Sequence, residues 1–494
     1  MGKKAYIMWL IIGSLVFSLI LPMINYQHDQ WRVLHCDYES SYIDITINKS
    51  FLKTAYLLDN PQKYEMLMFG SSRNAAFVES DIAPHAYNAY SDFGVIGNHL
   101  HTLRVLLKHG VVPKRLWIGL NDFDIWKDPD DFQKDYSKCP YPETFYSWLS
   151  WYQLYFYKLI DTNDLDIWRG KKYLEKSDRI YRQNLKVHKK ALIQKEEKIQ
   201  KKGNKWRHKM TKMAATLLGY QDTPSVYRID QTIDEIKQLL LLSKRYSIKT
   251  TFFIYPSFYK TYVLYNQKKM ESFKRKLVKV TDFYDFYKLD ATAYDELKWH
   301  DTSHFLYSVG REIEIKIQQG VEKINKENIE AVLYEERTLR RSLLQKIFPL
   351  PYIMRLNTYL EIPGLRQVWD PSLAILKVNT QLKIVHTESR YQLKSGGKDP
   401  YFFIDGYQAS AKNVMMYCEL ESPKRTLFQI FYKTAKEQRY TEKNSAKFTV
   451  YKGHNVFRLL IPASLIRYGL RIDPVSDKGV YQVKNGVFGI NDYG

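Results

Sequence analysis

Cysteine is scarce in this chain, whose 494 residues include Cys36, Cys139 and Cys418 and no others. No two of these have the spacing of a metal-binding pair, and three thiols form at most one disulfide, so a disulfide framework is excluded. The sequence also lacks a His-x-x-x-His pair on an expected helix and a glycine-rich phosphate loop. We therefore expect neither a metal ion nor another cofactor.

Charge is absent from one long stretch, Ala5 to Tyr26, which is 22 residues long and follows Lys3 and Lys4. About 20 apolar residues suffice to span a bilayer as a helix. The positive flank predicts a cytoplasmic amino terminus, with the rest of the chain on the outer face of the cytoplasmic membrane. No small-x-small site follows the run, which favours an uncleaved anchor over the alternative, a cleaved signal peptide.

The rest of the composition is that of a globular chain, with 45% hydrophobic and 15% aromatic residues. Its net charge of +22 implies an anionic neighbour, which is a membrane surface, an acidic polymer or nucleic acid. An outside location and the lack of any nucleic-acid-binding motif argue against nucleic acid.

Two short stretches far apart carry the residues of a nucleophilic site. The apolar run Met66 to Phe69 ends in Gly70-Ser71-Ser72, a junction that can project a serine hydroxyl from the carboxyl end of a strand. Asp301 and His304 stand three residues apart far downstream and can supply a base and its orienting carboxylate from one turn.

Together these blocks resemble the SGNH/GDSL hydrolase superfamily over roughly residues 60 to 320. A third block, Gly-x-Asn-Asp, matches Gly119 to Asp122, where the apolar run that begins at Leu116 ends. The family's second block is a glycine after the second strand, and Gly94 is the choice here, with Gly97 as the alternative. Ser71 stands where many members carry aspartate, which leaves open which serine attacks, although the third position of the block favours Ser72.

The resemblance implies a catalytic triad of Ser72, His304 and Asp301. It also implies an oxyanion hole made by the Ser72 amide, the Gly94 amide and the Asn121 side chain. Each residue has a structural alternative: the serines can cap a helix, His304 can be a core histidine, and Asn121 can end a strand in a turn.

The order of elements predicts a fold and its domains. Residues 1–27 form the transmembrane anchor, and residues 28–325 form an α/β domain with a parallel, flavodoxin-like sheet that has helices on both faces. Residues 326–370 are expected to be a linker, and residues 371–494, with short strands between turns, a β-sandwich. The sandwich loosely resembles accessory domains of envelope-polysaccharide enzymes, and a purely structural role stays open.

A helical insertion is expected at about residues 123–228. Its first part is rich in aromatic residues between Phe145 and Tyr157, which suits a packed core, a sugar-stacking wall or a surface that dips into the membrane interface beside the anchor. Its second part, Arg169 to Lys212, is strongly basic, which suits a solvated helix face or a patch for an anionic polymer or lipid.

Three hypotheses about function follow. A membrane-anchored, extracytoplasmic member of this superfamily is similar to alginate O-acetyltransferase subunits and to the D-alanyl-lipoteichoic acid transfer protein. The first hypothesis is therefore an O-acyl (acetyl) transferase acting on an envelope or secreted polysaccharide, with a multi-spanning membrane acyltransferase as the partner that supplies the acyl group. The second is a carbohydrate esterase with the same triad. The third is a non-catalytic protein that binds or assembles polysaccharide.

Overall fold

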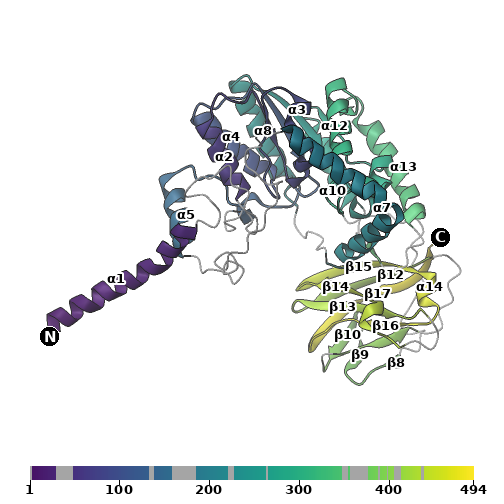
Figure 1. Cartoon of the computed structure of the whole chain (residues 1–494). Helices are drawn as coiled ribbons and strands as arrows, with labels where there is room; N and C mark the ends of the chain where they lie inside the picture. The colour runs from purple at the N-terminus through teal and green to yellow at the C-terminus, as the bar shows by residue number, and fades with distance from the viewer. Residues whose placement is uncertain are drawn as a thin grey trace.

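The computed structural model describes residues 3–28, 48–132, 138–157, 185–220, 227–262, 265–347, 354–356, 377–387, 390–397, 399–404, 413–434 and 439–493. Helix α1 (Lys3–His28) projects from the rest of the chain and contacts α5 (Phe145–Tyr157), and its stretch Ala5–Gln27 is long and apolar enough to cross a membrane. Figure 1 shows α1 projecting from an α/β unit, with a second unit of β-strands below that unit.

The α/β unit is built on a six-stranded sheet with the strand order β2-β1-β3-β4-β5-β6. Its first five strands pair in parallel, as the sequence predicted. The sixth strand, β6, departs from that prediction, because it pairs antiparallel with β5. Because β1 lies between β2 and β3, the order reverses beside β1, where open sheets of this kind place ligands. The strands are β1 (Met66–Phe69), β2 (Ala86–Asn88), β3 (Arg115–Leu120), β4 (Lys249–Ile254), β5 (Phe283–Asp285) and β6 (Lys323–Ile324).

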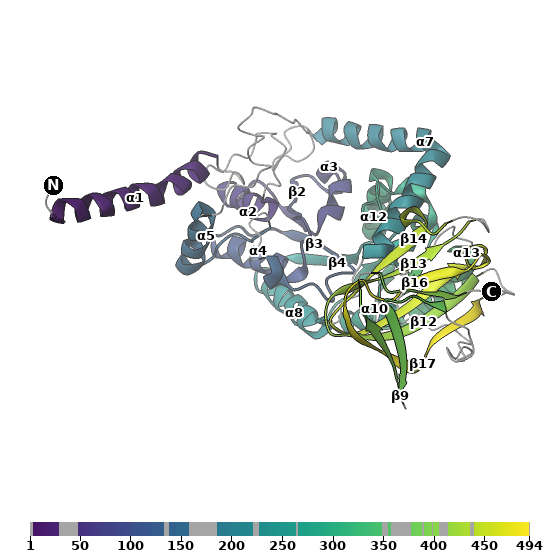
Figure 2. The same ribbon diagram turned by 90° about the horizontal axis from the view of Figure 1, so that it is seen from below.

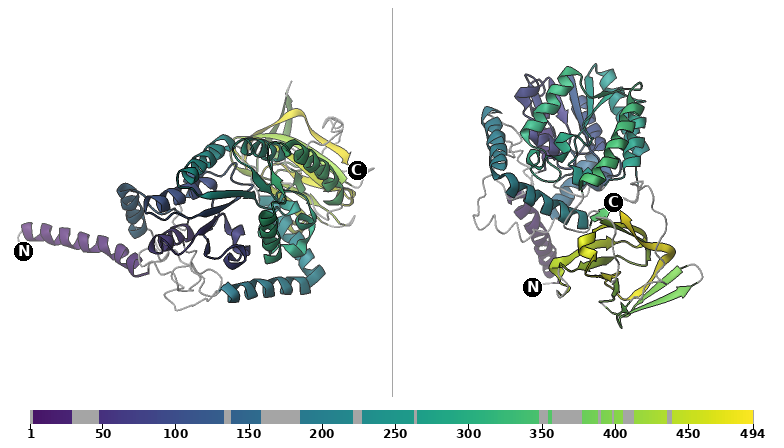
Figure 3. Two further views of the ribbon diagram at one scale, coloured as in Figure 1. Left: turned by 90° about the horizontal axis from the view of Figure 1, so that it is seen from above. Right: turned by 90° about the vertical axis from the view of Figure 1, so that its right-hand side faces the viewer.

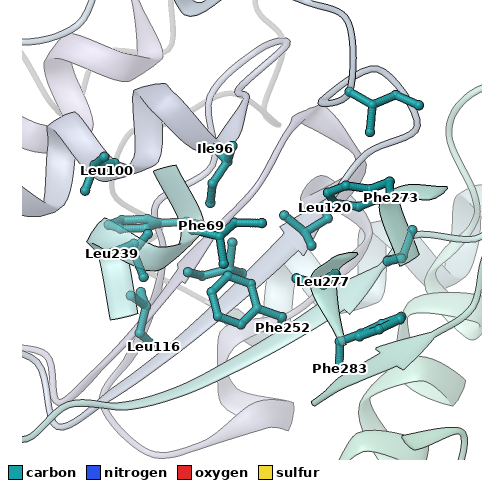
Figure 4. Close-up of a cluster of buried hydrophobic side chains, with 14 of the residues drawn as sticks. Phe69, Ile96, Leu100, Leu116, Leu120, Leu239, Phe252, Phe273, Leu277 and Phe283 are labelled. Atoms are coloured by element: carbon teal, nitrogen blue, oxygen red, sulfur yellow. The ribbon is translucent and has the colours of Figure 1, made fainter. Parts of the chain in front are cut away.

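Both faces of this sheet are buried, because alternate side chains of each strand enter different cores. Leu67 and Phe69 enter the larger core, which Figure 4 shows in part, whereas Met66 and Met68 enter the smaller one. The larger core is covered by α2 (Lys49–Asp59), α4 (Ile96–Lys108), α8 (Ile229–Arg245), α10 (Gln267–Leu277) and α13 (Ile329–Ile347). The smaller core is covered by α3 (Glu79–Ile82), α7 (Leu185–Tyr220) and α12 (Tyr307–Gln319).

Helix α13 occupies part of the segment that the sequence predicted as a linker. Its buried Ile329 and Leu333 belong to the larger core. An amphipathic helix with apolar residues at i and i+4 is more stable when this apolar side packs on a core than when the helix crosses solvent as a linker. The α/β unit therefore extends past residue 325, at least to the end of α13.

The predicted insertion contains two long helices of different character. Helix α5 (Phe145–Tyr157) is uncharged, and it packs beside α1. Helix α7 is basic and bends at Gly203, and Figure 2 shows its two arms running in different directions. Some of its basic side chains form ion pairs with the α/β unit, as Lys189 does with Asp81 and Arg207 with Glu296. Residues 169–184 of the predicted basic run and Cys36 lie outside the described residues, while Cys139 and Cys418 are buried.

The second unit consists of two antiparallel sheets on a shared apolar core. One sheet has the order β7-β15-β12-β17-β10-β9 and the other β14-β13-β16-β11-β8, and Figure 3 shows them packed face to face. The first sheet comprises β7 (Met354–Leu356), β9 (Leu382–Thr387), β10 (Arg390–Ser395), β12 (Asn413–Ser422), β15 (Gly453–Pro462) and β17 (Gly479–Tyr493). The second comprises β8 (Lys377–Val378), β11 (Phe402–Ile404), β13 (Thr426–Tyr432), β14 (Ser445–Val450) and β16 (Leu470–Asp473).

The two units touch. Met415 of β12 and Leu460 of β15 lie in the larger core of the α/β unit, and α7 contacts β7 and β14. The β-strand unit therefore packs on the larger core through the sheet that contains β12 and β15. It also contacts helix α7 of the α/β unit.

Candidate active site

The two adjacent serines after β1 have different surroundings. Ser71 is buried and caps the short helix η1 (Ser72–Ala76), where its Oγ accepts the Arg73 N–H at 3.3 Å and donates to Asn121 Oδ1 at 2.7 Å. Ser72 is half-buried, and its Oγ lies 2.8 Å from Nε2 of His304. Ser71 thus has a capping role, and Ser72 is the serine within reach of a base.

His304 and Asp301 lie in the loop between η3 (Glu296–Lys298) and α12. Nδ1 of His304 is 2.8 Å from Oδ2 and 3.0 Å from Oδ1 of Asp301. The main-chain N–H groups of Ser303 and His304 each donate to Oδ1 of Asp301 at 2.8 Å. The three predicted triad residues therefore form one continuous hydrogen-bonded chain across 232 positions of sequence.

Asp301 is held as a carboxylate by these contacts. Burial raises its pKa, but hydrogen bonds from His300, His304 and the Ser303 N–H, together with the charge of His304, bring the pKa far below the usual range of aspartate. An ionised Asp301 fixes the Nδ1–H tautomer of His304, which leaves Nε2 free to accept the proton of Ser72 Oγ.

Gly94 and Asn121 lie against the same strand end. The structure favours Gly94 over Gly97 for the predicted second block, because a Cβ on Gly94 would meet the Gly70 carbonyl oxygen at 2.9 Å. Gly97 instead sits in α4 against Pro129. Asn121 is fully buried, and its Nδ2 donates to the Gly94 carbonyl at 3.2 Å and to Oδ2 of Asp124 at 3.1 Å.

The three predicted oxyanion donors are therefore not equally available. The Gly94 N–H already donates to the Ser91 carbonyl at 3.2 Å, and the Asn121 amide is engaged as described. The Ser72 N–H opens η1, and the first amides of a helix have no partner within that helix. The Ser72 amide is thus the donor that the helix itself leaves open at the nucleophile.

Sequence reasoning missed Arg73, which joins the three blocks. Its buried guanidinium pairs with Asp122, with Nη2 3.1 Å from Oδ1, and its Nε donates to the main-chain carbonyl of Ser303 at 3.2 Å. The Arg73 side chain thus connects the segment of Ser72 with the end of β3 at Asp122 and with the loop that carries His304. The sequence offered one indication of this ion pair: two of the motif blocks carry opposite charges, because Arg73 directly follows Ser72 and Asp122 directly follows Asn121.

Asp124 is a second residue that sequence reasoning missed. Its Oδ2 accepts the Asn121 N–H at 2.5 Å, and its Oδ1 accepts the Ile96 N–H at 2.8 Å at the start of α4. It therefore fixes Asn121 against the helix that follows β2.

Tyr255, at the end of β4, explains the glycines of two blocks. A Cβ on Gly70 would lie 2.0 Å from its hydroxyl oxygen, and a Cβ on Gly119 would lie 2.1 Å from its Cζ. Its hydroxyl donates to Oδ1 of Asn74 at 2.6 Å. Glycine is needed at both positions because one buried ring fills the space beside both strands.

Aromatic side chains stand beside the Gly94 loop. Phe93 has a φ of +56°, which is rare for a residue with a Cβ, and 56% of its side chain is exposed. Its ring centroid lies 6.3 Å from that of Phe123, and the Lys138 ammonium lies 5.3 Å from the Phe93 ring. Phe123 also covers the Arg73 guanidinium at 5.8 Å. An exposed, strained aromatic residue therefore sits one position from Gly94.

A cavity of about 710 Å³ lies elsewhere, lined by residues of α4, α5, α8 and η2 (Pro129–Phe132). None of the triad residues lines it, so it is separate from the hydrogen-bonded chain. Within the part of the chain that the structure describes, no group of three or more His, Cys, Asp or Glu side chains is arranged to hold a metal ion.

No protein-family model and no curated protein matches this chain. Among solved structures, the capsular polysaccharide assembling protein CapF from Staphylococcus aureus is 10% identical, with 87% of this chain and 96% of CapF covered and a TM-score of 0.14. The enzymatically active domain of tailspike protein 4 of bacteriophage CBA120 is 12% identical, with 24% of this chain covered and a TM-score of 0.18, and the match spans 19% of the tailspike chain. The C-terminal CBM6 of the laminarinase LamC from Zobellia galactanivorans is 11% identical, with 24% of this chain and 96% of the CBM6 covered and a TM-score of 0.12. TM-scores this low carry no argument about the fold or the function of this chain.

Proposed function

We propose that this chain is a membrane-anchored serine acyltransferase of the SGNH type that modifies an envelope or secreted polysaccharide outside the cytoplasmic membrane. The observation that carries the proposal is the chain of hydrogen bonds from Ser72 through His304 to Asp301. A half-buried serine, a histidine and an ionised carboxylate in this order form the arrangement that activates a serine for acyl transfer.

The reaction begins with attack by Ser72 on the carbonyl carbon of a donor ester. The Ser72 Oγ–carbon bond forms while the Oγ proton moves to Nε2 of His304. The intermediate then collapses, the bond to the donor alcohol breaks, and His304 returns the proton to that alcohol. A sugar hydroxyl next attacks the acyl-Ser72 ester, gives its proton to His304, and leaves as the acylated sugar when Ser72 regains its proton.

The negative oxygen of each tetrahedral intermediate needs a fixed N–H donor. The Ser72 N–H at the start of η1 is the first such donor in this proposal. The Gly94 N–H and the Asn121 amide add to it when the substrate oxygen replaces their present acceptors, as catalytic hydrogen bonds often tighten only in the complex. Arg73 and Asp124 act as positioning residues, because they hold the strand ends and not the reacting atoms.

Hydrolysis is the competing reaction, since water in place of the sugar hydroxyl makes the same site a carbohydrate esterase. The side chain of His304 is 38% exposed, so water reaches the base in the free protein. Transfer then requires an acceptor that covers this opening, and the exposed ring of Phe93 beside Phe123 offers an apolar surface on which a sugar ring can lie.

The cellular setting of the proposal rests on α1. A single apolar helix anchors the chain but cannot carry an acyl group across the bilayer, so the transferase needs a multi-spanning membrane acyltransferase as its donor partner. The net charge of +22 suits an anionic polymer as acceptor.

The proposal is tested with the full chain in detergent or nanodiscs. A fluorophosphonate probe and a chromogenic acetate ester are applied to the wild type and to Ser72→Ala, His304→Ala and Ser71→Ala. We expect Ser72→Ala to lose all labelling and its turnover to fall by about 10⁴-fold or more, because only the serine oxygen can carry the acyl group. Ser71→Ala is the matched control and retains labelling, because its hydroxyl caps η1.

A wild-type chain that is folded by circular dichroism but neither labels nor turns over the ester would overturn the catalytic proposal. If turnover occurs, adding oligosaccharide acceptors separates the two reactions. A transferase forms acylated sugar at the expense of free acetate, whereas an esterase releases acetate at an unchanged rate.

A further inference from the structure

Helix α5 has two faces of different kinds. One face is packed: the Trp151 ring is buried, stacks on Phe51 at 5.3 Å and donates its indole N–H to Cys139 Sγ at 3.0 Å. Trp148, three residues earlier on the same side, meets Phe51 edge to face at 5.9 Å. This face fixes α5 to the α/β unit.

The other face of α5 is apolar and uncovered. Phe145, Tyr146 and Leu149 are 74%, 79% and 52% exposed, and Tyr152, which is 36% exposed and stacks on Trp148 at 5.3 Å, borders the same face one turn further along. Residues at i, i+1, i+4 and i+7 fall on one side of a helix. The 13 residues of α5 include no charged side chain, although 26% of the chain is charged. A contiguous exposed face of this kind marks a surface that another apolar phase covers.

The position of α5 identifies that phase. Helix α5 contacts α1, and Figures 1 and 2 show it beside the end of α1 that faces the α/β unit. The apolar stretch of α1 ends at Gln27, so α5 lies at the level where the chain leaves the hydrocarbon layer. Tyrosine and tryptophan are the side chains enriched at this level of membrane proteins.

We propose that α5 is an interfacial helix whose face of Phe145, Tyr146, Leu149 and Tyr152 inserts into the outer interface of the bilayer that α1 spans. This inference rests on the proposed membrane anchor and not on the proposed chemistry. Lipid suits this face better than an anionic polymer does, because a polymer site needs cationic or hydrogen-bonding side chains and α5 supplies no charge. Attachment through both α1 and α5 fixes the orientation of the α/β unit on the membrane, which a single anchor would leave free.

The test measures the depth of single labelled positions in the full chain reconstituted into phosphatidylcholine vesicles. Cys36 is replaced by serine, and the buried thiols of Cys139 and Cys418 are left, because buried thiols react poorly. An environment-sensitive fluorophore is attached at Tyr146→Cys, Leu149→Cys, Leu15→Cys in α1 or Tyr334→Cys in α13. Tyr334 is the matched control, since it is a similarly exposed tyrosine (72%) on α13, which Figure 1 shows on the side of the α/β unit away from α1.

We expect the emission at positions 146 and 149 to shift to shorter wavelength in vesicles and to be quenched by lipids that carry a nitroxide near the headgroup. Position 15 should be quenched by a nitroxide deep in the acyl chain, and position 334 by neither. If position 15 is quenched and positions 146 and 149 behave like position 334, the anchor stands and the interfacial helix is refuted. A blue shift at 146 without quenching by any lipid also refutes it, because a protein surface then covers the helix. If position 15 is not quenched either, the membrane anchor itself fails.

Discussion

Asn121 and Asn455 are both buried asparagines with several hydrogen bonds, yet they represent two kinds of region. Asn121, in the α/β unit, bonds to Ser71, Gly94 and Asp124, and so joins three strand ends. Asn455, in the β-strand unit, accepts the Tyr451 N–H and donates to the carbonyls of Tyr451 and Gly453, and so holds its own hairpin; beyond the hairpin its side chain makes a longer bond of 3.4 Å to the Leu420 carbonyl of the neighbouring strand β12. Buried polar groups that link distant segments preorganise a site, whereas those that satisfy neighbours stabilise a turn.

The same contrast extends to the acidic residues, and it predicts the largest effect. Asp301→Asn should lower turnover of the acetate ester by about 10⁴-fold, because an amide stabilises the wrong tautomer of His304. Asp473→Asn is the control, since Asp473 is likewise paired through both oxygens, in its case with Arg471 of the β-strand unit. The measurement is kcat for each purified full-length variant. Turnover of Asp301→Asn within about tenfold of the wild type would remove this residue from the mechanism.

The two asparagines give the next effect. Asn121→Ala should lower turnover by about 10²- to 10³-fold, as the loss of one oxyanion donor typically does. Asn455→Ala should leave turnover unchanged and destabilise its own unit by about 1–3 kcal/mol, because main-chain groups of the hairpin lose their partners. Activity and thermal unfolding are measured on both variants. Equal loss of activity in the two would mean that Asn121 acts only through stability.

Much of the α/β unit could be predicted from its sequence, for physical reasons. The apolar pattern of the sequence predicts a strand over Arg115–Leu120 and a helix over Gly97–His109; β3 has those bounds and α4 begins one residue earlier, because apolar periodicity reports burial directly. β6 could not be found, since it has two residues and its position depends on pairing with β5. In the β-strand unit β10 was missed, because Arg390 to Ser395 contains too few apolar residues to form an alternating pattern.

The candidate site divides in the same way. Residue type and spacing pointed to Asp301 and His304, the resemblance to the SGNH/GDSL superfamily favoured Ser72 over Ser71, and the structure brings Ser72, His304 and Asp301 together. Which hydrogen bonds Gly94 and Asn121 make could not be predicted, because they depend on the positions of Ser91 and Asp124 in three dimensions. The part played by α5 stayed open for a similar reason, since a sequence of aromatic residues does not tell which face of a helix is covered.

A third prediction concerns the strained Phe93. At most sites glycine is less stable than alanine, but at a φ of +56° the order should reverse, because a Cβ in this conformation costs on the order of 1–3 kcal/mol. We therefore expect Phe93→Gly to melt at a higher temperature than Phe93→Ala. Both variants should raise KM for an oligosaccharide acceptor by about tenfold, which corresponds to ~1.4 kcal/mol, while turnover of the small ester stays unchanged.

The control for Phe93 comes from the other unit. Phe403 stacks on Tyr440 with ring centroids 5.6 Å apart in the β-strand unit. If Phe403→Ala raises the acceptor KM as much as Phe93→Ala, then the β-strand unit holds part of the acceptor site and the contrast between the two units fails. An unchanged KM for Phe93→Ala would exclude this ring from acceptor binding.

The smallest expected effect is a pH dependence of stability that arises at a buried charge cluster of the α/β unit. Lys274 is buried between two carboxylates, 2.6 Å from Asp285 and 2.6 Å from Glu336. Burial raises the pKa of Glu336 to about 7; Lys274 opposes this rise, and the charge of Asp285 adds to it. The pKa of the folded state thus exceeds the ordinary value of 4.5, so the folded chain binds more protons between these pH values. The free energy of unfolding should therefore fall as pH rises from about 4.5 to about 7.

Glu336→Gln should lessen this fall, because glutamine does not titrate, but it should not abolish the fall, because burial also raises the pKa of Asp124 and of Glu314 in the same unit to about 7. Tryptophan fluorescence isolates the α/β unit, since residues 377–493 contain no tryptophan. The control is Glu442→Gln in the β-strand unit, where a hydrogen bond from Lys447 lowers the pKa of Glu442 and the dependence has the opposite sign. That acid is exposed, so its substitution should leave the fluorescence transition unchanged at every pH. A Glu336→Gln variant that keeps the wild-type slope would show that Glu336 is ionised in the folded chain throughout, with Lys274 strong enough to hold both carboxylates.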